Sequence, residues 1–177
     1  MNHRNRFILW CWVGSLFARI VGGGSPILEH LYSLEAVDLQ VSVPAYEPVL
    51  AVSPSELRQE IASRVRSVLA EQSLRVSPGA AVHLLVSVDY NSDAPVAGPG
   101  ALLVDFELYE PAVLVRPWNS SKQRSLEVVT WKSHRLEVVY GKRLRESLQN
   151  GIDAVARELA DEVSQAKSYR ARVAPPG

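Results

Sequence analysis

The chain has 177 residues, and its 19 basic and 19 acidic side chains give a formal net charge of zero. Hydrophobic residues make up 47% and charged residues 21%, which is ordinary globular usage and excludes collagen-like, disulfide-scaffold and wholly disordered proteins. No segment approaches the roughly 18 consecutive apolar residues that a membrane-spanning helix needs. The length suits a single domain.

The N-terminal segment, residues 1–24, has the three-part pattern of a secretory signal peptide. Arg4 and Arg6 come first, an apolar core spans 7–18, and small residues follow it. We therefore expect a periplasmic or secreted protein. Two alternatives stay open, because an acid-poor leader with arginines is also typical of organelle import, and an apolar segment can form a buried N-terminal helix.

Cys11 is the only cysteine of the chain. Lipid-modified cysteines normally follow a small residue, whereas the bulky Trp10 precedes Cys11 and the apolar segment before it is too short for a signal core. Lipid anchoring is therefore not expected. Removal of the leader would leave a chain without disulfides, whose core alone stabilises it.

Charge is distributed unevenly along the mature chain. Removing the leader leaves 16 basic and 19 acidic side chains, a net charge of −3. Residues 25–110 carry −8, residues 111–145 carry +6, and the remaining 32 residues carry −1. This asymmetry predicts that charge contributes to the recognition of a partner.

The first two predicted elements are a strand and a helix. Residues 36–43 alternate apolar and polar side chains, which is typical of a half-buried strand. Ser53, Pro54 and Glu56 then form a capping-box pattern, and apolar residues at helical spacing follow it. The sequence therefore predicts a helix over 54–73.

The second half of the chain predicts more strands and a final helix. Alternation of side chains indicates strands over 80–90, 101–110 with a continuation over 112–116, 126–131, and, after a hinge at 133–135, a short further strand over 136–140. An amphipathic helix begins at Leu144 and its apolar stripe reaches Val163. Gly151 within it costs about 1 kcal/mol relative to alanine.

This order of elements, β-α-β-β-β-α, predicts an α+β fold. The economical arrangement is a two-layer sandwich, with a mainly antiparallel sheet of three to five strands and both helices on one face. Residues 25–165 are expected to form this single domain, and residues 166–177 a flexible polar tail.

Motifs for catalysis or metal binding are not found in the sequence. It contains no Gly-x-Ser-x-Gly elbow and no phosphate-binding loop, and the histidines of the mature chain are far apart. We therefore expect a non-enzymatic protein without a cofactor. Asp105 and Glu107 project from one face of a strand, so a carboxylate-based hydrolase on the open sheet face is the alternative.

Two surfaces are candidates for binding a partner. The first is the sheet face opposite the helices, where Tyr109 and Trp131 are expected beside carboxylates. An exposed tryptophan there is typical of protein docking, and the alternative is that Trp131 tucks under residues 133–141.

The second candidate surface is a cationic rim suited to phosphate-bearing ligands, formed if the strand turns bring the basic residues of the 116–145 segment together. These residues are Arg116, Lys122, Arg124, Lys132, Arg135, Lys142, Arg143 and Arg145. Scattered solvated charges are the alternative. The partner is expected to be an envelope protein or an anionic glycolipid. Nucleic acid is not expected, because the mature chain is net negative.

The leader, the size and the order of elements over residues 36–165 resemble the LPS-assembly lipoprotein family of the bacterial outer membrane. The resemblance implies a small sheet backed by two helices and a location in the cell envelope. Members of that family carry a lipid-modified cysteine, and Cys11 does not match this feature.

Overall fold

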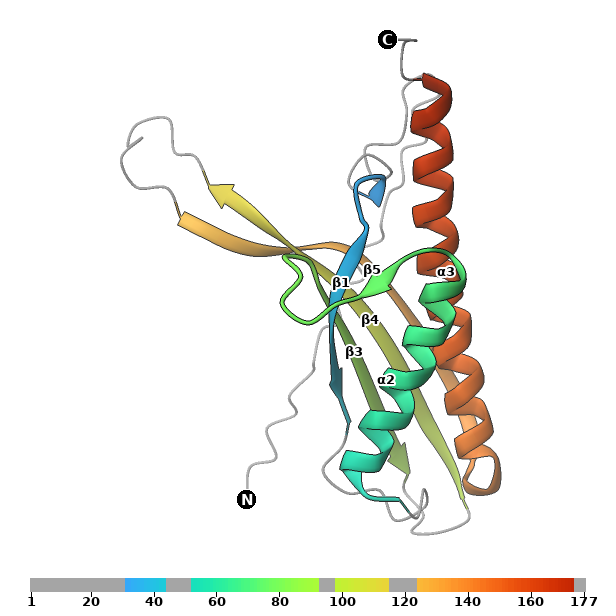
Figure 1. Cartoon of the computed structure of the whole chain (residues 1–177). Helices are drawn as coiled ribbons and strands as arrows, with labels where there is room; N and C mark the ends of the chain where they lie inside the picture. The colour runs from blue at the N-terminus through green and yellow to red at the C-terminus, as the bar shows by residue number, and fades with distance from the viewer. Residues whose placement is uncertain (1–30, 44–51, 93–97, 115–123, 174–177) are drawn as a thin grey trace, which may run out of the picture.

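A computed structural model describes residues 31–43, 52–92, 98–114 and 124–173. Five strands form one sheet in the order β2-β1-β3-β4-β5, and helices α2 and α3 pack together on one side of it (Figure 1). The elements are β1 (Ala36–Ser42), α2 (Pro54–Glu71), β2 (Arg75–Val76), β3 (His83–Ser92), β4 (Pro99–Leu114), β5 (Arg124–Tyr140), the 3-10 turn η2 (Gly141–Arg143) and α3 (Leu144–Val173).

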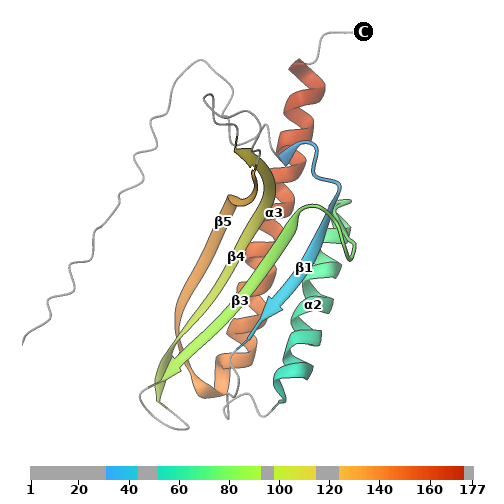
Figure 2. The same ribbon diagram turned by 90° about the vertical axis from the view of Figure 1, so that its left-hand side faces the viewer.

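The predicted α+β class is confirmed, with both helices against the same face of the sheet (Figure 2). The sheet is mixed, because β1 runs parallel to both β2 and β3, whereas β3, β4 and β5 are antiparallel neighbours. The parallel pairing of β1 with β3 follows from the helical crossover through α2, which returns the chain to the end of the sheet where β1 began.

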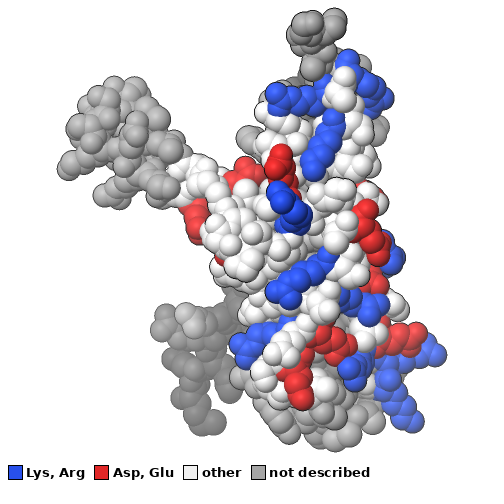
Figure 3. Space-filling view, in the orientation of Figure 1, with Lys and Arg blue, Asp and Glu red and all other residues white. Residues whose placement is uncertain are grey.

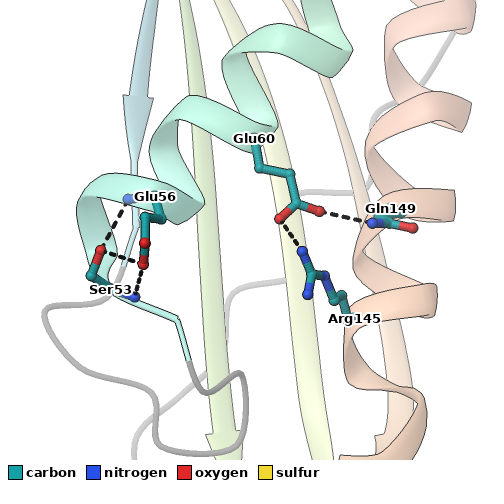
Figure 4. A network of polar contacts seen from close by, with 5 residues as sticks. All are labelled: Ser53, Glu56, Glu60, Arg145 and Gln149. Carbon is teal, nitrogen blue, oxygen red and sulfur yellow. Dashed lines mark hydrogen bonds and ion pairs between the residues drawn. The ribbon is translucent and has the colours of Figure 1, made fainter.

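Helix α2 begins where the sequence predicts. The Ser53 hydroxyl accepts a hydrogen bond from the Glu56 backbone N–H at 3.2 Å, and the Glu56 carboxylate accepts one from the Ser53 N–H at 2.9 Å (Figure 4). Pro54 occupies the first turn, where its missing N–H has no intrahelical partner to lose. The residues that α2 buries are Leu57, Ile61, Val65, Val68 and Leu69.

Strands β4 and β5 are longer than the alternation pattern indicates. Strand β4 runs through Pro111 without a break, because β3 pairs with β4 only as far as Tyr109. Beyond that point the missing N–H of Pro111 removes no hydrogen bond to β3. Strand β5 is continuous through residues 133–135, where the sequence predicts a hinge. The far ends of β4 and β5 project beyond the other strands as a hairpin (Figure 1).

Helix α3 covers β4 and β5 and extends to Val173, beyond the predicted start of the tail at residue 166. Ala166 is buried, and the Arg170 guanidinium lies 3.8 Å from the ring centroid of Tyr32, so the last turns of the helix are packed. Gly151 faces Val104 of β4 at close range: a Cβ atom there would lie 3.3 Å from Val104 Cγ2. This close approach explains a glycine in the middle of the helix.

Hydrogen bonds between polar side chains connect helix α2 to helix α3. Arg64 of α2 donates two hydrogen bonds to Asp153 of α3, at 2.5 and 2.8 Å. Glu60 of α2 accepts hydrogen bonds from Arg145 and Gln149 of α3, both at 2.8 Å (Figure 4). Burial by itself raises the pKa of Glu60, but these hydrogen bonds outweigh it and hold the pKa below its ordinary value.

Candidate functional site

The face of the sheet that the helices leave uncovered, here called the open face, carries a cluster of charged side chains at its centre. They come from four neighbouring strands, and alternation along each strand directs them away from the helices. The cluster consists of Asp38 on β1, His83 on β3, Asp105, Glu107 and Tyr109 on β4, and Glu127 and Lys132 on β5.

Lys132 bridges the two carboxylates of β4. Its ammonium donates to Asp105 Oδ2 at 2.9 Å and to Glu107 Oε1 at 2.6 Å. The Tyr109 hydroxyl donates to the other Glu107 oxygen at 2.5 Å. The hydrogen bond from Lys132, followed by that from Tyr109, lowers the pKa of Glu107, and the same carboxylate raises the pKa of Lys132 and of Tyr109. Glu107 is therefore a carboxylate and Lys132 an ammonium at neutral pH.

His83 lies between two further carboxylates of the open face. Its Nδ1 is 3.6 Å from Asp38 Oδ2, and its Nε2 is 3.5 Å from Glu127 Oε1. His83 Nδ1 and Asp105 Oδ1 are both buried without a hydrogen-bond partner in the structure. A shallow cavity of about 180 Å³ opens over the ring, lined by Gln40, His83, Leu85, Tyr109 and Glu127.

The chemistry of this cluster favours binding of positively charged groups. Four carboxylates face one ammonium, so the open face has an excess of negative charge at its centre. No group of three His, Cys, Asp or Glu residues suited to a metal ion occurs in the described part of the chain. The carboxylate pair Asp105 and Glu107 is held by the shared Lys132, which lowers the pKa of Glu107, whereas a general acid needs a raised pKa.

Trp131 does not lie on the open face, so its predicted exposure there is wrong. Its side chain is 6% exposed and lies on the helix side, where Nε1 donates to Glu162 Oε2 of α3 at 2.8 Å. The reason is a β-bulge in which the register shifts: Tyr109 pairs with Val129, and Leu108 pairs with Trp131. The additional residue, Thr130, reverses the alternation and turns Trp131 to the other side.

The packing of Trp131 against Glu162 of α3 can be tested through the pH dependence of the protein's stability. Burial raises the pKa of Glu162, the hydrogen bond from Trp131 partly opposes this, and the nearby Glu158 raises it further. The folded state therefore binds this proton more tightly than the unfolded state, and stability falls as pH rises from the ordinary carboxyl range through the raised pKa. Glu162→Gln keeps an oxygen that accepts from Trp131 and removes this loss.

We expect Glu162→Gln to raise the free energy of unfolding at neutral pH by about 0.5 kcal/mol and to have little effect at acidic pH. Urea unfolding of the variant and the parent between about pH 4 and 8 measures the difference. Asp161→Asn, at the exposed neighbouring position of α3, is the control and should not reproduce the pH-dependent gain. An equal gain from both variants would contradict the assignment to Glu162.

The described basic residues of the predicted cationic rim do not gather into one surface. Lys132 is held by carboxylates on the open face, Arg135 Nε donates to Glu137 at 3.0 Å, and Arg145 donates to Glu60 of α2. The physical reason is that residues close in sequence separate by about 3.3 Å each along an extended strand. Basic side chains are likewise spread along the helix layer among acidic ones (Figure 3).

The remaining members of that set are placed only in part. Lys142 and Arg143 are exposed in η2, at the start of α3. The backbone of Arg124 begins β5 opposite Leu114, and Arg116 and Lys122 lie outside the described residues. Binding of a ligand by any of these residues stays a prediction.

The sequence did not single out a group of exposed apolar side chains on β5. Leu136, Val138 and Tyr140 are 66%, 76% and 61% exposed. Their alternation with Glu137 and Val139 indicates the strand over 136–140, but the pattern does not show that these apolar side chains stay exposed.

Comparison with known proteins assigns no family. No protein-family model matches this chain, and no curated protein sequence matches it. Solved structures that match include a PelC dodecamer from Paraburkholderia phytofirmans, with 16% identity over 76% of this chain and 86% of that chain and a TM-score of 0.37.

Two other matches are named lipoproteins. A minor lipoprotein from Acinetobacter baumannii has 13% identity over 75% of this chain and 94% of that chain, with a TM-score of 0.33. A lipoprotein from Caulobacter crescentus has 16% identity over 86% of this chain and 100% of that chain, with a TM-score of 0.34. These similarities are too low to establish a family or a function, so the resemblance to LPS-assembly lipoproteins stays a prediction. Among the described helices, none is long and apolar enough to span a membrane.

Proposed function

We propose that this protein is an exported, non-catalytic protein of the cell envelope that binds a basic segment of a protein partner on its open face. The leader pattern of residues 1–24 supports export. The observation that carries the binding proposal is the central cluster, which holds four carboxylates and a single ammonium: Asp105 and Glu107 bind Lys132, whereas Asp38 and Glu127 flank His83. A lysine or arginine side chain supplies the charge and the donors that this arrangement accepts.

The charge of the open face favours this partner over an anionic glycolipid. A phosphate-bearing ligand would meet Asp38 and Glu127 on either side of His83, and it would compete with two carboxylates for Lys132. Like charges placed together across an interface oppose binding. Binding of an anionic glycolipid is therefore the alternative result that the experiments below distinguish from binding of a basic protein segment.

Site-specific photo-crosslinking in the source cells tests the proposal. A photoreactive residue replaces Gln40, which borders the cavity over His83, or Arg66, which is exposed on α2 on the opposite side of the molecule. We expect Gln40 to crosslink to one protein, at a lysine- or arginine-rich segment identified by mass spectrometry, and Arg66 not to crosslink to it. Equal crosslinking from both positions would contradict the proposal.

Charge reversal provides the matched control. Glu127→Lys changes a side chain that is 64% exposed, so folding should be retained, and it should weaken the crosslink from Gln40 several-fold. Glu71→Lys makes the same change of charge on α2 and should leave the crosslink unaltered. If the chain instead binds vesicles that contain an anionic glycolipid and Glu127→Lys strengthens this binding without altering the crosslink, the glycolipid alternative replaces our proposal.

A further inference from the structure

Strand β5 is a long edge strand that no other described strand pairs along its outer side. It has 17 residues, whereas the strand at the opposite edge, β2, has two. Proteins commonly protect a sheet edge by keeping it short or by placing proline in it. The β2 edge follows this rule. Strand β5 has a bulge at Thr130 and several charged side chains, which also protect an edge, but residues 132–140 beyond the bulge contain neither proline nor glycine and pair regularly with β4, so this part is able to pair with another strand.

The C-terminal half of β5 exposes an apolar surface on the open face. Leu136, Val138 and Tyr140 are the most exposed of the large hydrophobic side chains in the described residues. Leu136 pairs with Leu103 of β4, which extends the apolar surface inward from the edge. An apolar surface of this kind next to an unpaired edge is typical of a protein interface.

Two charged residues flank Leu136 on the other face of β5. Arg135 Nε lies 3.0 Å from Glu137 Oε1, and both side chains are about one-third to one-half exposed. In an antiparallel pair, residues directly opposite each other point to the same face. If two β5 strands pair with Leu136 opposite Leu136, each Arg135 lies opposite the second copy's Glu137.

Among antiparallel registers centred on residues 132, 135, 136, 137 and 138, the one centred on Leu136 satisfies both the charges and the apolar residues. Centring the pair on Arg135, Glu137 or Lys132 would set that charge against itself, which is unfavourable between strands. Centring it on Val138 would pair only residues 136–140 and leave Arg135 opposite no residue of β5. Centring it on Leu136 pairs residues 132–140 and joins Leu103 and Leu136 of both copies into one apolar strip.

We infer that the protein forms a two-fold symmetric dimer in which β5 pairs antiparallel with β5 of a second copy, centred on Leu136. The two five-stranded sheets then form one continuous sheet, with helices on one side and both open faces on the other. This inference goes beyond the proposed function, because it uses the edge of the sheet and does not depend on what binds the central cluster.

Charge exchange at the dimer axis is the first test. Sedimentation of the purified full chain is expected to show a species of twice 19.5 kDa. Arg135→Glu and Glu137→Arg should each weaken the dimer by at least about tenfold, because two attractive pairs become repulsive. The double variant R135E/E137R restores both pairs and should restore the dimer. Arg66→Glu, a charge reversal on α2, should have no effect.

Disulfide crosslinking tests the register. In a Cys11→Ala background, Leu136→Cys should form an interchain disulfide with itself, because opposite residues lie about 4.5–5.5 Å apart between Cα atoms. His134→Cys and Val138→Cys should each fail to link to themselves, since the two copies would be about 13 Å apart. Mixed together, the His134→Cys and Val138→Cys proteins should link to each other.

Three results would overturn the inference. The first is a monomer at all concentrations up to about 100 µM, a range that detects the micromolar affinities of weak dimers. The second is a double variant that stays as weak as the single ones. The third is self-linking of Val138→Cys in place of Leu136→Cys.

Discussion

Replacement of Trp131 by alanine should lower the free energy of unfolding by about 3–5 kcal/mol, the usual cost of removing a large buried aromatic side chain. The indole is 6% exposed beneath α3, and it donates to Glu162 at 2.8 Å. Its removal leaves a cavity between β5 and α3 and a partly buried carboxyl without its donor. Urea unfolding followed by circular dichroism measures the change.

Trp131→Phe separates packing from the hydrogen bond. Phenylalanine retains much of the apolar contact and lacks the N–H, so we expect a smaller loss of about 1–2 kcal/mol. Tyr169→Ala removes an aromatic side chain that is 40% exposed on α3 and should cost less than about 0.5 kcal/mol. A Trp131→Ala protein as stable as the parent, with a weakened partner crosslink from Gln40, would instead support the docking role predicted from the sequence.

Substitution of Gly100 should have the second largest effect. A Cβ atom at this position would overlap Tyr90 Oη and lie 2.5 Å from two carbons of its ring. Tyr90 is 9% exposed and belongs to the core, so its ring cannot move into solvent without exposing apolar surface. We expect Gly100→Ala to cost about 1–3 kcal/mol, as overpacking of a core does.

A double-mutant cycle with Tyr90→Ala assigns this cost to the contact. If the ring is the obstacle, Gly100→Ala in the Tyr90→Ala background should cost less than about 0.5 kcal/mol. An unchanged cost in that background would show that the backbone at residue 100, and not the tyrosine, requires glycine. Both costs are measured as differences in urea midpoint at a constant slope.

Local patterns in the sequence were sufficient to predict most of the elements. The capping residues Ser53 and Glu56 located the start of α2, and strict alternation located β1 and β3 within a few residues. The sequence did not predict the parallel pairing of β1 with β3 or the short strand β2. These depend on contacts between residues distant in the chain, for which a single strand carries no local signal.

The candidate site was predicted only where alternation is regular. Alternation places Asp105 and Glu107 correctly on the open face, but the bulge at Thr130 reverses the pattern just before Trp131. A β-branched threonine suits either a regular strand or a bulge, so nothing local marks the irregularity. The bridge from Lys132 to both carboxylates of β4 depends on the register between strands, which the sequence alone does not specify.

The position of β1 within the sheet has a consequence for the order in which the chain can fold. Strands β3, β4 and β5 follow one another directly and are neighbours in the sheet, so they can pair by closing short loops. Strand β1 is synthesised first but lies between β2 and β3, both of which follow it in the chain. The hydrogen bonds of β1 can therefore form only after β2 and β3 have been synthesised. The sheet of β3, β4 and β5 can then provide the edge on which β1 completes its pairing.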